Sequence, residues 1–214
     1  MTIEHHPEEG TLAAYAVGAL DLGQRVALAT HLRSCPRCQG WVRAMEGLGG
    51  ALIADSPRSE MRAGALAHAL ARLDEPQPAT SPKAREAADA PPELPTFVRR
   101  YEFGPWRFVA PGVRMRPIHL PEPSPTRVFL LKVAANTTLL AHEHTALEMT
   151  CVLRGAFRHA GGRYGPGDFD LGEETVLHEP HIEPGQECVS LVAMQGELLW
   201  KGFWGRLAQP FLRL

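Results

Sequence analysis

The segment His31-Leu-Arg-Ser-Cys35-Pro-Arg-Cys38 places three metal-ligating side chains at intervals of four and three residues. On an α-helix these intervals put all three side chains along one stripe. Two cysteines separated by two residues can chelate a single ion, and structural Zn²⁺ sites take four tetrahedral nitrogen or sulfur ligands. The segment therefore predicts a small helical domain built around zinc, with one ligand still to come from elsewhere in the chain.

The fourth zinc ligand is expected near the start of the chain, where two histidines are adjacent. We predict His6, with His5 as its rival. Cys35 and Cys38 could instead be a redox pair of the C-x-x-C kind, or two unrelated helix residues. No strand–turn–helix pattern precedes them, and a redox pair has no need of a histidine four residues upstream. Zinc is therefore the favoured interpretation.

The residues around this segment, from Pro7 to about Leu73, are rich in Ala and Leu at helical spacing, which predicts a small helical bundle. Asp21 followed by Gln24 resembles a capping box. Proline fits the first turn of a helix because its missing N–H has no partner there. Four helices are predicted, with starts at Pro7, Asp21, Pro36 and Ser56–Pro57, and the first ends near Gly18.

The fourth predicted helix carries an apolar stripe that consists of Met61, Leu66, Leu70 and Leu73. Such a stripe is commonly part of a core. A late amphipathic helix in so small a domain is also a natural surface for binding a partner. On the residues alone, both interpretations stay open.

The composition changes twice along the chain. Residues 75–95 are rich in Pro, Ala, Ser, Glu and Lys, and such a segment does not bury enough apolar surface to order itself. After Phe97, short runs of Val, Phe, Leu and Tyr alternate with Gly and Pro, which predicts a sandwich or barrel. Strands are expected at 127–133, 148–153, 157–159, 187–192 and 197–200, with a tight turn at Gly161–Gly162.

This pattern predicts an α+β chain whose helical and β parts form separate, structurally independent domains. The predicted boundaries are a helical domain at residues 1–80, a linker at 81–95 and a β domain at 96–214. The formal net charge is −2, which provides no basic field for direct binding of nucleic acid or of an anionic membrane. No apolar run approaches the roughly 18–20 residues that span a bilayer, and the amino terminus lacks a signal-peptide pattern, so a cytoplasmic location is expected.

Three features together resemble the ChrR-type family of zinc-containing anti-sigma factors. They are His-x3-Cys-x2-Cys with a histidine about 25 residues upstream, Ala-Tyr-Ala-x-Gly-x-Leu at residues 14–20, and Ala-Thr-His-Leu at residues 29–32. The resemblance implies that the helical domain binds an extracytoplasmic-function sigma factor and keeps it from RNA polymerase. It also implies a carboxy-terminal cupin β-barrel, a double-stranded β-helix. It favours the apolar stripe as a partner surface.

The sequence His142-Glu-His144-Thr-Ala-Leu-Glu148 resembles the first cupin motif. Residues two apart on a strand point to the same face, so His142 and His144 are expected to look into one barrel interior. Glu148, on or near the next strand, is expected to bind the same metal ion as these two histidines. The sequence therefore predicts a second metal site inside the barrel.

The fourth ligand of this second site follows the turn at residues 164–168, which resembles the second cupin motif. The family spacing favours His178, and His181 is the rival. Three imidazoles and one carboxylate suit Zn²⁺ and equally Fe, Mn, Ni or Cu ions. Cys151 is expected to pack in the barrel as a small apolar residue. Cys188 is either the same or an oxidant-sensitive thiol, and the inert interpretation is favoured.

The function predicted from this resemblance is that of a regulatory protein, not an enzyme. The helical domain sequesters the sigma factor and releases it when the cupin domain senses an oxidant of the singlet-oxygen type. The alternative is a metal-dependent cupin enzyme, for example a dioxygenase acting on a small diketone-like molecule, with the zinc domain as an accessory. The anti-sigma motif in the same chain argues against that alternative.

Overall fold

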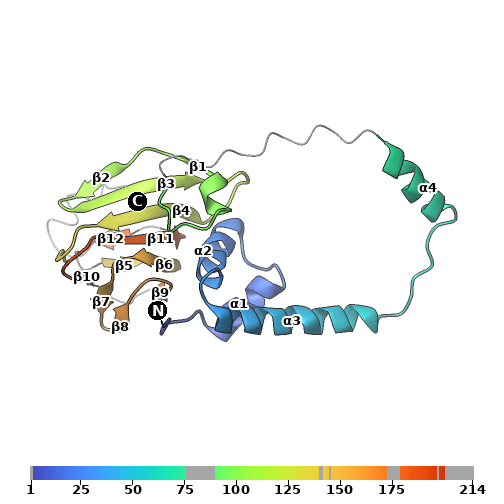
Figure 1. Cartoon of the computed structure of the whole chain (residues 1–214), viewed down its shortest axis with the longest axis horizontal. Coiled ribbons are helices and arrows are strands. Elements are labelled where there is room, and N and C mark those ends of the chain that lie inside the picture. Colours follow the sequence, from blue (N-terminus) through green and yellow to red (C-terminus); the bar gives the residue numbers. More distant parts are fainter. Residues whose placement is uncertain are drawn as a thin grey trace.

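The computed structural model describes residues 2–75, 90–139, 142–144, 146–172, 179–196 and 198–200. Helices occupy the first part of the chain and antiparallel strands the second (Figure 1). Helix α2 lies beside the strands, α3 runs outward from them, and α4 stands apart from both. No helix in the described ranges is both long and apolar enough to cross a bilayer.

The helices begin and end largely where local signals place them. Asp21 and Gln24 form the predicted capping box, and Pro36 occupies the first turn of its helix. The first helix ends just before Gly18, whose φ of 73° is a left-handed conformation that favours glycine. The helices are α1 (Glu9–Ala16), α2 (Leu22–Leu32), α3 (Pro36–Ala54) and α4 (Ala65–Ala71), followed by the 3₁₀ turn η1 (Arg72–Asp74).

The start predicted for the fourth helix is wrong. Helix α4 begins at Ala65 and not at Ser56–Pro57, because Gly64 before it has a φ of 79° that a continuous helix does not contain. The apolar stripe therefore begins outside the helix, with Met61 in the segment that connects α3 to α4.

The strands form a large curved sheet and two smaller ones. The large sheet has the order β1-β3-β4-β11-β6-β9, with β2 added on β3; the smaller sheets have the orders β10-β7-β8 and β12-β5. Their bounds are β1 (Glu102–Phe103), β2 (Arg107–Ala110), β3 (Val113–His119), β4 (Arg127–Val133), β5 (His142–His144), β6 (Glu148–Arg154), β7 (Phe157–His159), β8 (Gly162–Tyr164), β9 (Phe169–Gly172), β10 (His181–Ile182), β11 (Cys188–Met194) and β12 (Leu198–Trp200). The 3₁₀ turn η2 (Val98–Arg100) precedes β1.

The five predicted strand runs all correspond to strands, within one or two residues at each end. The predicted turn joins β7 to β8, where His159 pairs with Gly162. Strands β1, β2, β3, β8, β9 and β10 were not predicted.

Helix α2 and the β domain share one hydrophobic core. Leu28 of α2 and Leu191 of β11 are both 0 % exposed and belong to the same cluster, and α2 packs on β11, β6 and β4. Leu94, which we assigned to the linker, is buried in this cluster too. The prediction of two structurally independent domains is therefore wrong for α2. A second cluster, which includes Phe129 and Phe157, consists of buried residues on the strands alone.

A polar cluster fastens the beginning of α2 to the β domain. The Asp21 carboxylate accepts hydrogen bonds from Ser124 Oγ at 2.8 Å, Thr126 Oγ1 at 2.6 Å and Gln195 Nε2 at 3.0 Å. It also caps α2 by accepting from the Gly23 and Gln24 amides. Burial acts to raise the pKa of Asp21, but these hydrogen bonds outweigh it and lower the pKa below its usual range.

Candidate metal centre and partner surface

Four potential metal ligands converge beside the start of α3. The ligand atoms of His6, His31, Cys35 and Cys38 all lie within 4.8 Å of one another. His6 comes from the amino-terminal arm before α1, and His31 lies in the last turn of α2. Cys35 is the N-cap of α3 and Cys38 lies in its first turn. The predicted set is thus brought together by one helix–helix junction and one arm.

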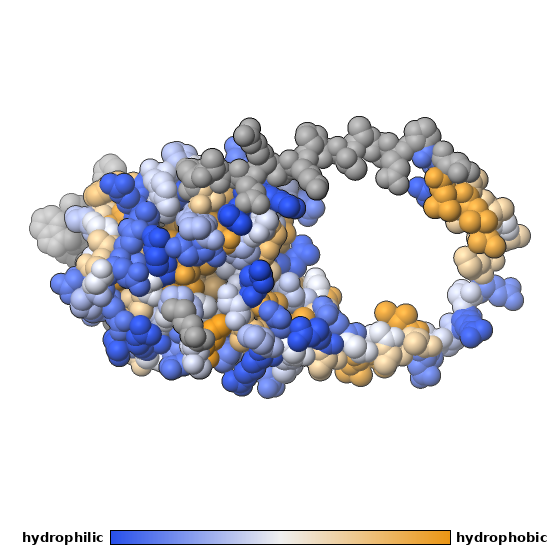
Figure 2. All heavy atoms as spheres, in the orientation of Figure 1, coloured by the Kyte–Doolittle hydropathy of each residue, from blue (hydrophilic) through white to orange (hydrophobic). Residues whose placement is uncertain are grey.

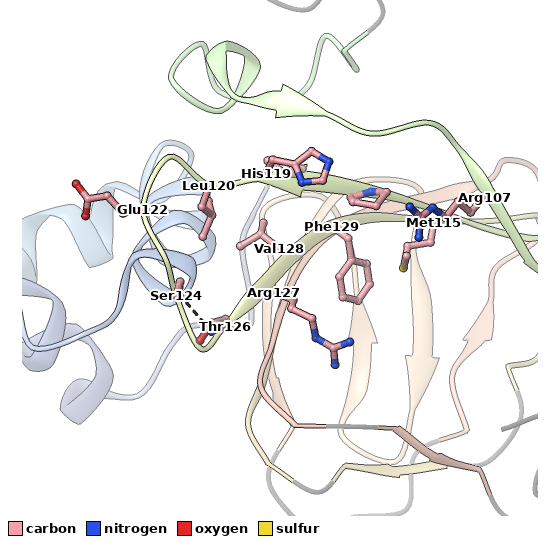
Figure 3. Close-up of a pocket in the computed structure, with 12 residues that line it drawn as sticks. Arg107, Met115, His119, Leu120, Glu122, Ser124, Thr126, Arg127, Val128 and Phe129 are labelled. Atoms are coloured by element: carbon pink, nitrogen blue, oxygen red, sulfur yellow. Dashed lines mark hydrogen bonds between the residues drawn. The ribbon is translucent and has the colours of Figure 1, made fainter. Parts of the chain in front are cut away.

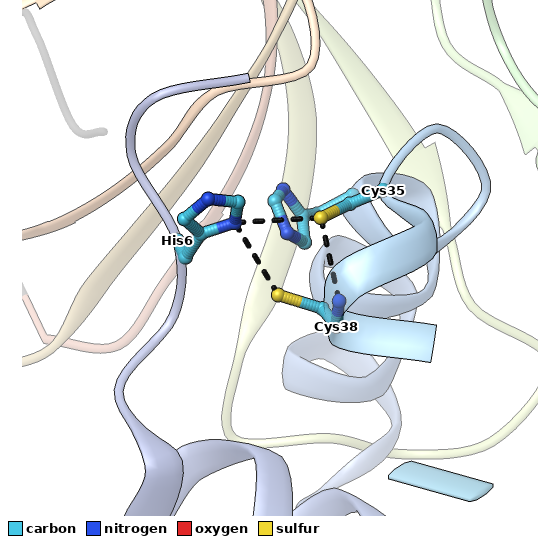
Figure 4. A group of neighbouring side chains, drawn as sticks. His6, Cys35 and Cys38 are labelled. Carbon is cyan, nitrogen blue, oxygen red and sulfur yellow. Dashed lines mark hydrogen bonds between the residues drawn. The ribbon is translucent and has the colours of Figure 1, made fainter. Parts of the chain in front are cut away.

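The imidazole of His6 faces both sulfur atoms (Figure 4). His6 Nδ1 lies 3.3 Å from Cys35 Sγ and 3.4 Å from Cys38 Sγ. The Cys38 amide donates to Cys35 Sγ at 3.4 Å, so the cap geometry of α3 also orients that sulfur. Two sulfurs and two imidazole nitrogens in one compact cluster are a donor set typical of structural zinc.

The ring of His31 gives a direct test of whether a cation fits. Its Nδ1 lies 2.7 Å from the carbonyl oxygen of Gly167, so Nδ1 carries the proton and donates. Nε2 then carries a lone pair, yet it is buried and has no hydrogen-bond partner among the residues described. A buried polar atom left unsatisfied costs about 1–3 kcal/mol. A metal ion bound at the cluster would satisfy this nitrogen.

The protonation states also suit a divalent cation. Burial lowers the pKa of His31 to about 4, and burial with the nearby Arg37 charge lowers that of His6, so both imidazoles are neutral at neutral pH. Burial, together with the adjacent Cys35 thiol, raises the pKa of Cys38 to about 12. A bound cation is what favours the thiolate form of such a cysteine.

His5, the rival ligand, points elsewhere. Its ring stacks on Tyr164, with ring centroids 4.0 Å apart. Its amide donates to the carboxyl group of Asp168 on the β domain. The geometry therefore favours His6 over His5 as the fourth ligand.

Much of the second predicted site falls outside the described residues. The backbones of His142 and His144 form β5, which pairs with β12, but their side chains and the whole of His178 are not among the described parts. Glu148 begins β6, is half-buried, and accepts a hydrogen bond from Thr150 Oγ1 at 3.0 Å. His181 lies in β10 with its Nδ1 2.9 Å from Thr138 Oγ1. This cupin site stays a prediction.

The two cysteines of the β domain are buried. Burial raises the pKa of Cys151 to about 12 and that of Cys188 to about 11. A thiol that reacts with oxidants usually has a lowered pKa and some exposure. The structure thus favours the inert interpretation of both residues.

A hollow of about 370 Å³ lies along the hairpin of β3 and β4 (Figure 3). Arg127 and Phe129 point to the same side of β4 and line it, with Arg107 and His119 also in the lining. The sequence patterns do not predict this hollow, because its lining combines β4 with β2 and β3, two strands that the patterns do not reveal.

The predicted partner stripe is exposed. Met61, Leu66, Leu70 and Leu73 are 53–78 % exposed. Apolar side chains gather on α4 and on the outer end of α3 (Figure 2). The exposed large apolar residues of α3 are Leu48, Leu52 and Ile53, which lie outside the predicted stripe.

Comparisons with known proteins account for both parts of the chain. The family described as "Putative zinc-finger" matches residues 11–39, and the "ChrR Cupin-like domain" family matches residues 96–197. The anti-sigma-E factor ChrR of Cereibacter sphaeroides is 34 % identical over 215 residues, covering 100 % of both chains. The chain belongs to the ChrR-type family of anti-sigma factors.

A solved structure agrees with this assignment. The crystal structure of Rhodobacter sphaeroides SigE in complex with the anti-sigma ChrR matches with a TM-score of 0.74 and 31 % identity, covering 91 % of this chain and 100 % of that one. The predicted family and fold class are confirmed: a ChrR-type helical zinc-finger region followed by a cupin-like β domain. The match to the zinc-finger family begins at residue 11, so His6 is assigned to the centre by geometry alone.

Proposed function

We propose that this chain is an anti-sigma factor that holds an extracytoplasmic-function sigma factor away from RNA polymerase. The observation that carries the proposal is the apolar surface of α3, the segment that connects it to α4, α4 and η1. This surface consists of Leu48, Leu52, Ile53, Met61, Leu66, Leu70 and Leu73. Its ChrR relative is a regulatory protein whose complex with SigE supports this kind of partner. Because a sigma factor acts on RNA polymerase, the proposal places the chain in the cytoplasm.

Helix α4 has too little support of its own to be a stable element. It contains seven residues, none of them buried. Isolated helices shorter than about 12–15 residues are marginal in water. A contiguous exposed apolar surface on such a helix is typical of a segment that is stabilised by a partner. The sigma factor is the proposed partner, seated against α3 and α4.

Zinc is the proposed occupant of the cluster of His6, His31, Cys35 and Cys38. The ion would supply folding free energy, since helices α1 to α3 form a short segment with a limited core of their own. By fixing the junction of α2 and α3 it would set the direction in which α3 leaves the β domain. The chain's own residues provide the rest: the cap at Cys35 and the hydrogen bond from His31 to Gly167.

The cupin domain is the proposed receiver of the signal. We propose that His142, His144, Glu148 and His178 hold Zn²⁺ or another divalent metal, and that an oxidant of the singlet-oxygen type acts there. Release of the sigma factor then requires that the signal interacts differently with the bound and released forms. The shared core of α2 and the β domain supports such coupling, because a change in the strands reaches the helices directly.

A binding experiment tests the partner surface. The chain is titrated against the sigma factor of its own organism, with Rhodobacter sphaeroides SigE as a reference, and transcription by RNA polymerase is measured in parallel. The double variant Leu66→Asp, Leu70→Asp is expected to bind at least about 100-fold more weakly, since buried apolar anchors each contribute about 2 kcal/mol or more. Phe108→Asp is the matched control, because Phe108 is equally exposed but lies on β2. Equal binding by the double variant and the control contradicts the proposal.

A further inference from the structure

The amino-terminal arm, residues 2–6, is held by a single turn of the β domain. Asp168, only 4 % exposed, lies in this turn just before β9. Its Oδ1 accepts hydrogen bonds from the amides of Glu4 at 2.7 Å and His5 at 3.0 Å. The Phe169 amide donates in return to the His5 carbonyl at 3.1 Å. The main chain is thus fixed on both sides of His5, immediately before the ligand His6.

The same turn holds a second ligand. The carbonyl of Gly167 accepts the hydrogen bond from His31 Nδ1 at 2.7 Å and so directs Nε2 toward the cluster. Ile3 packs against Gly167, and a Cβ added at Gly167 would lie 2.8 Å from Ile3 Cδ1. Gly167 also has a φ of 91°, which strains other residues. Glycine at position 167 therefore allows Ile3 of the arm to pack closely against the turn.

The turn is rigid for reasons of its own. The second oxygen of Asp168, Oδ2, accepts from the Gly165 amide at 2.8 Å, and the Asp168 amide donates to the Gly165 carbonyl at 2.9 Å. The carboxyl group therefore ties its own turn together with one oxygen and holds the arm with the other. Cys35 and Cys38, by contrast, lie at the N-cap and in the first turn of α3.

We propose that the turn at residues 165–169 is an outer support of the metal centre and that Asp168 is a positioning residue for it. The proposal rests on the proposed binding of a metal by the cluster. Groups that orient metal ligands through hydrogen bonds typically change metal affinity by about 10–100-fold when they are lost. Two of the four ligands depend on this turn, so the centre retains its metal best while α2 and the arm lie against the β domain.

The position of β9 links the support of the metal centre to the predicted cupin site. Asp168 precedes one end of this strand, and Gly172 at the other end pairs with Glu148, a predicted cupin ligand. Strand β9 therefore connects the surroundings of the cupin site to the turn that orients His6 and His31. A displacement of β9 changes the support of the metal centre without passing through the helices.

Metal release from the full chain tests the proposal. The chain is loaded with Co²⁺, whose thiolate-to-metal charge-transfer absorption reports a cysteine-ligated centre and not a His/Glu site. Excess EDTA is added, and the rate at which this absorption disappears is measured. Asp168→Asn is expected to lose the absorption about 10–100-fold faster than the unmodified chain. Asp170→Asn is the matched control, expected to stay within about twofold, because Asp170 bonds His159 of the β domain and not the arm.

The outcomes separate this proposal from the one it rests on. If the unmodified chain shows no charge-transfer absorption, the proposal that the cluster binds a metal is wrong, and the proposed support falls with it. If the unmodified chain shows it and a folded Asp168→Asn variant releases metal at the unmodified rate, metal binding stands and the proposed support is overturned. Should Asp168→Asn fail to fold, Ile3→Ala decides, since it removes the packing of the arm against Gly167 and leaves the hydrogen bonds of the turn intact. Faster release supports the proposal, and an unchanged rate overturns it.

Discussion

Replacing Asp21 by serine separates the two tasks of this residue. Serine is as good an N-cap as aspartate, so Asp21→Ser retains the start of α2. Its hydroxyl lies closer to the main chain than a carboxylate oxygen does, so it is not expected to reach Ser124, Thr126 or Gln195. The substitution therefore removes the hydrogen bonds that the carboxylate accepts from the β domain, while it leaves the helix cap in place.

The size of the effect follows from the three hydrogen bonds that the carboxylate accepts from the β domain. A hydrogen bond to a charged group contributes about 1.5–3 kcal/mol when it is buried. Asp21 is only partly buried, and water replaces part of each interaction, so we assign about 1 kcal/mol to each of the bonds from Ser124, Thr126 and Gln195. The free energy of unfolding is then expected to fall by about 2–3 kcal/mol.

The pH dependence has a definite sign. The hydrogen bonds depress the pKa of folded Asp21, so its stabilisation is complete above the unfolded pKa of about 3.9 and is lost as the pH falls through the folded value. The difference between the unmodified chain and Asp21→Ser is therefore constant near neutral pH. It shrinks under acid conditions, where Asp21 becomes protonated in both states.

Urea unfolding at several pH values, followed by circular dichroism and tryptophan fluorescence, measures this difference. Asp55→Ser is the control, because Asp55 is an exposed aspartate at the end of α3. Since α2 shares its core with the strands, both probes are expected to report one transition. A free energy of unfolding for Asp21→Ser within about 0.5 kcal/mol of the Asp55→Ser control refutes the reasoning.

Three further outcomes are expected. Cys35→Ser removes a ligand on which the fold of α1 to α3 depends, so metal content, helix content and sigma-factor binding are expected to fall together; a folded, inhibitory variant without metal contradicts this. His6→Ala is expected to lose the metal while His5→Ala retains it, as elemental analysis of the two purified chains would show, and the reverse result identifies His5 as the ligand. His142→Ala is expected to keep basal inhibition but leave the sigma factor sequestered under singlet oxygen in a transcription reporter, whereas constitutive release reverses the proposed direction of coupling.

Local signals in the sequence predicted the elements that depend on neighbouring residues. The capping box at Asp21 and the proline at position 36 mark helix starts that the structure contains. The ligand spacing of His31, Cys35 and Cys38 likewise depends only on helix geometry and one short turn. These features depend only on residues that are close together in the sequence, so the local sequence pattern predicts them.

Strand β3 was missed because its pattern contradicts the usual rules for strands. It contains Pro117, which lacks a donor for the sheet, and the charged Arg114 and Arg116. Arg116 is nevertheless buried, with its guanidinium over the Phe103 ring at 4.9 Å and its Nε donating to the Gly104 carbonyl at 2.8 Å. Those partners come from the neighbouring segment, and no local pattern reveals them.

The support of the metal centre was missed for a similar reason. The turn at residues 164–168 resembles a cupin motif, but it supports the metal centre through the Gly167 carbonyl, which bonds His31, and through the Asp168 carboxyl group, which holds the arm. Both groups lie far along the chain from the ligands that they position. Every residue has a main-chain carbonyl, so the residue type does not reveal which carbonyl acts as an acceptor. Only the packing of α2 on the strands, which we did not expect, brings the two together.

The metal ligands and the turn that orients them lie far apart in the sequence, so the ribosome makes the ligands long before it makes the turn. His31 bonds to a carbonyl 136 residues later, and the amides of Glu4 and His5 bond to a carboxyl 164 and 163 residues later. A ribosome that adds about 5–20 residues per second takes on the order of 10 s to reach that turn. During this time the arm and the helices carry all four ligands without the supporting turn of the β domain, and the face of α2 that later joins the core is uncovered. A newly made chain therefore first adopts a form in which the metal centre and α2 lack their contacts with the β domain. Chaperones or a sigma factor that bind during synthesis bind this form.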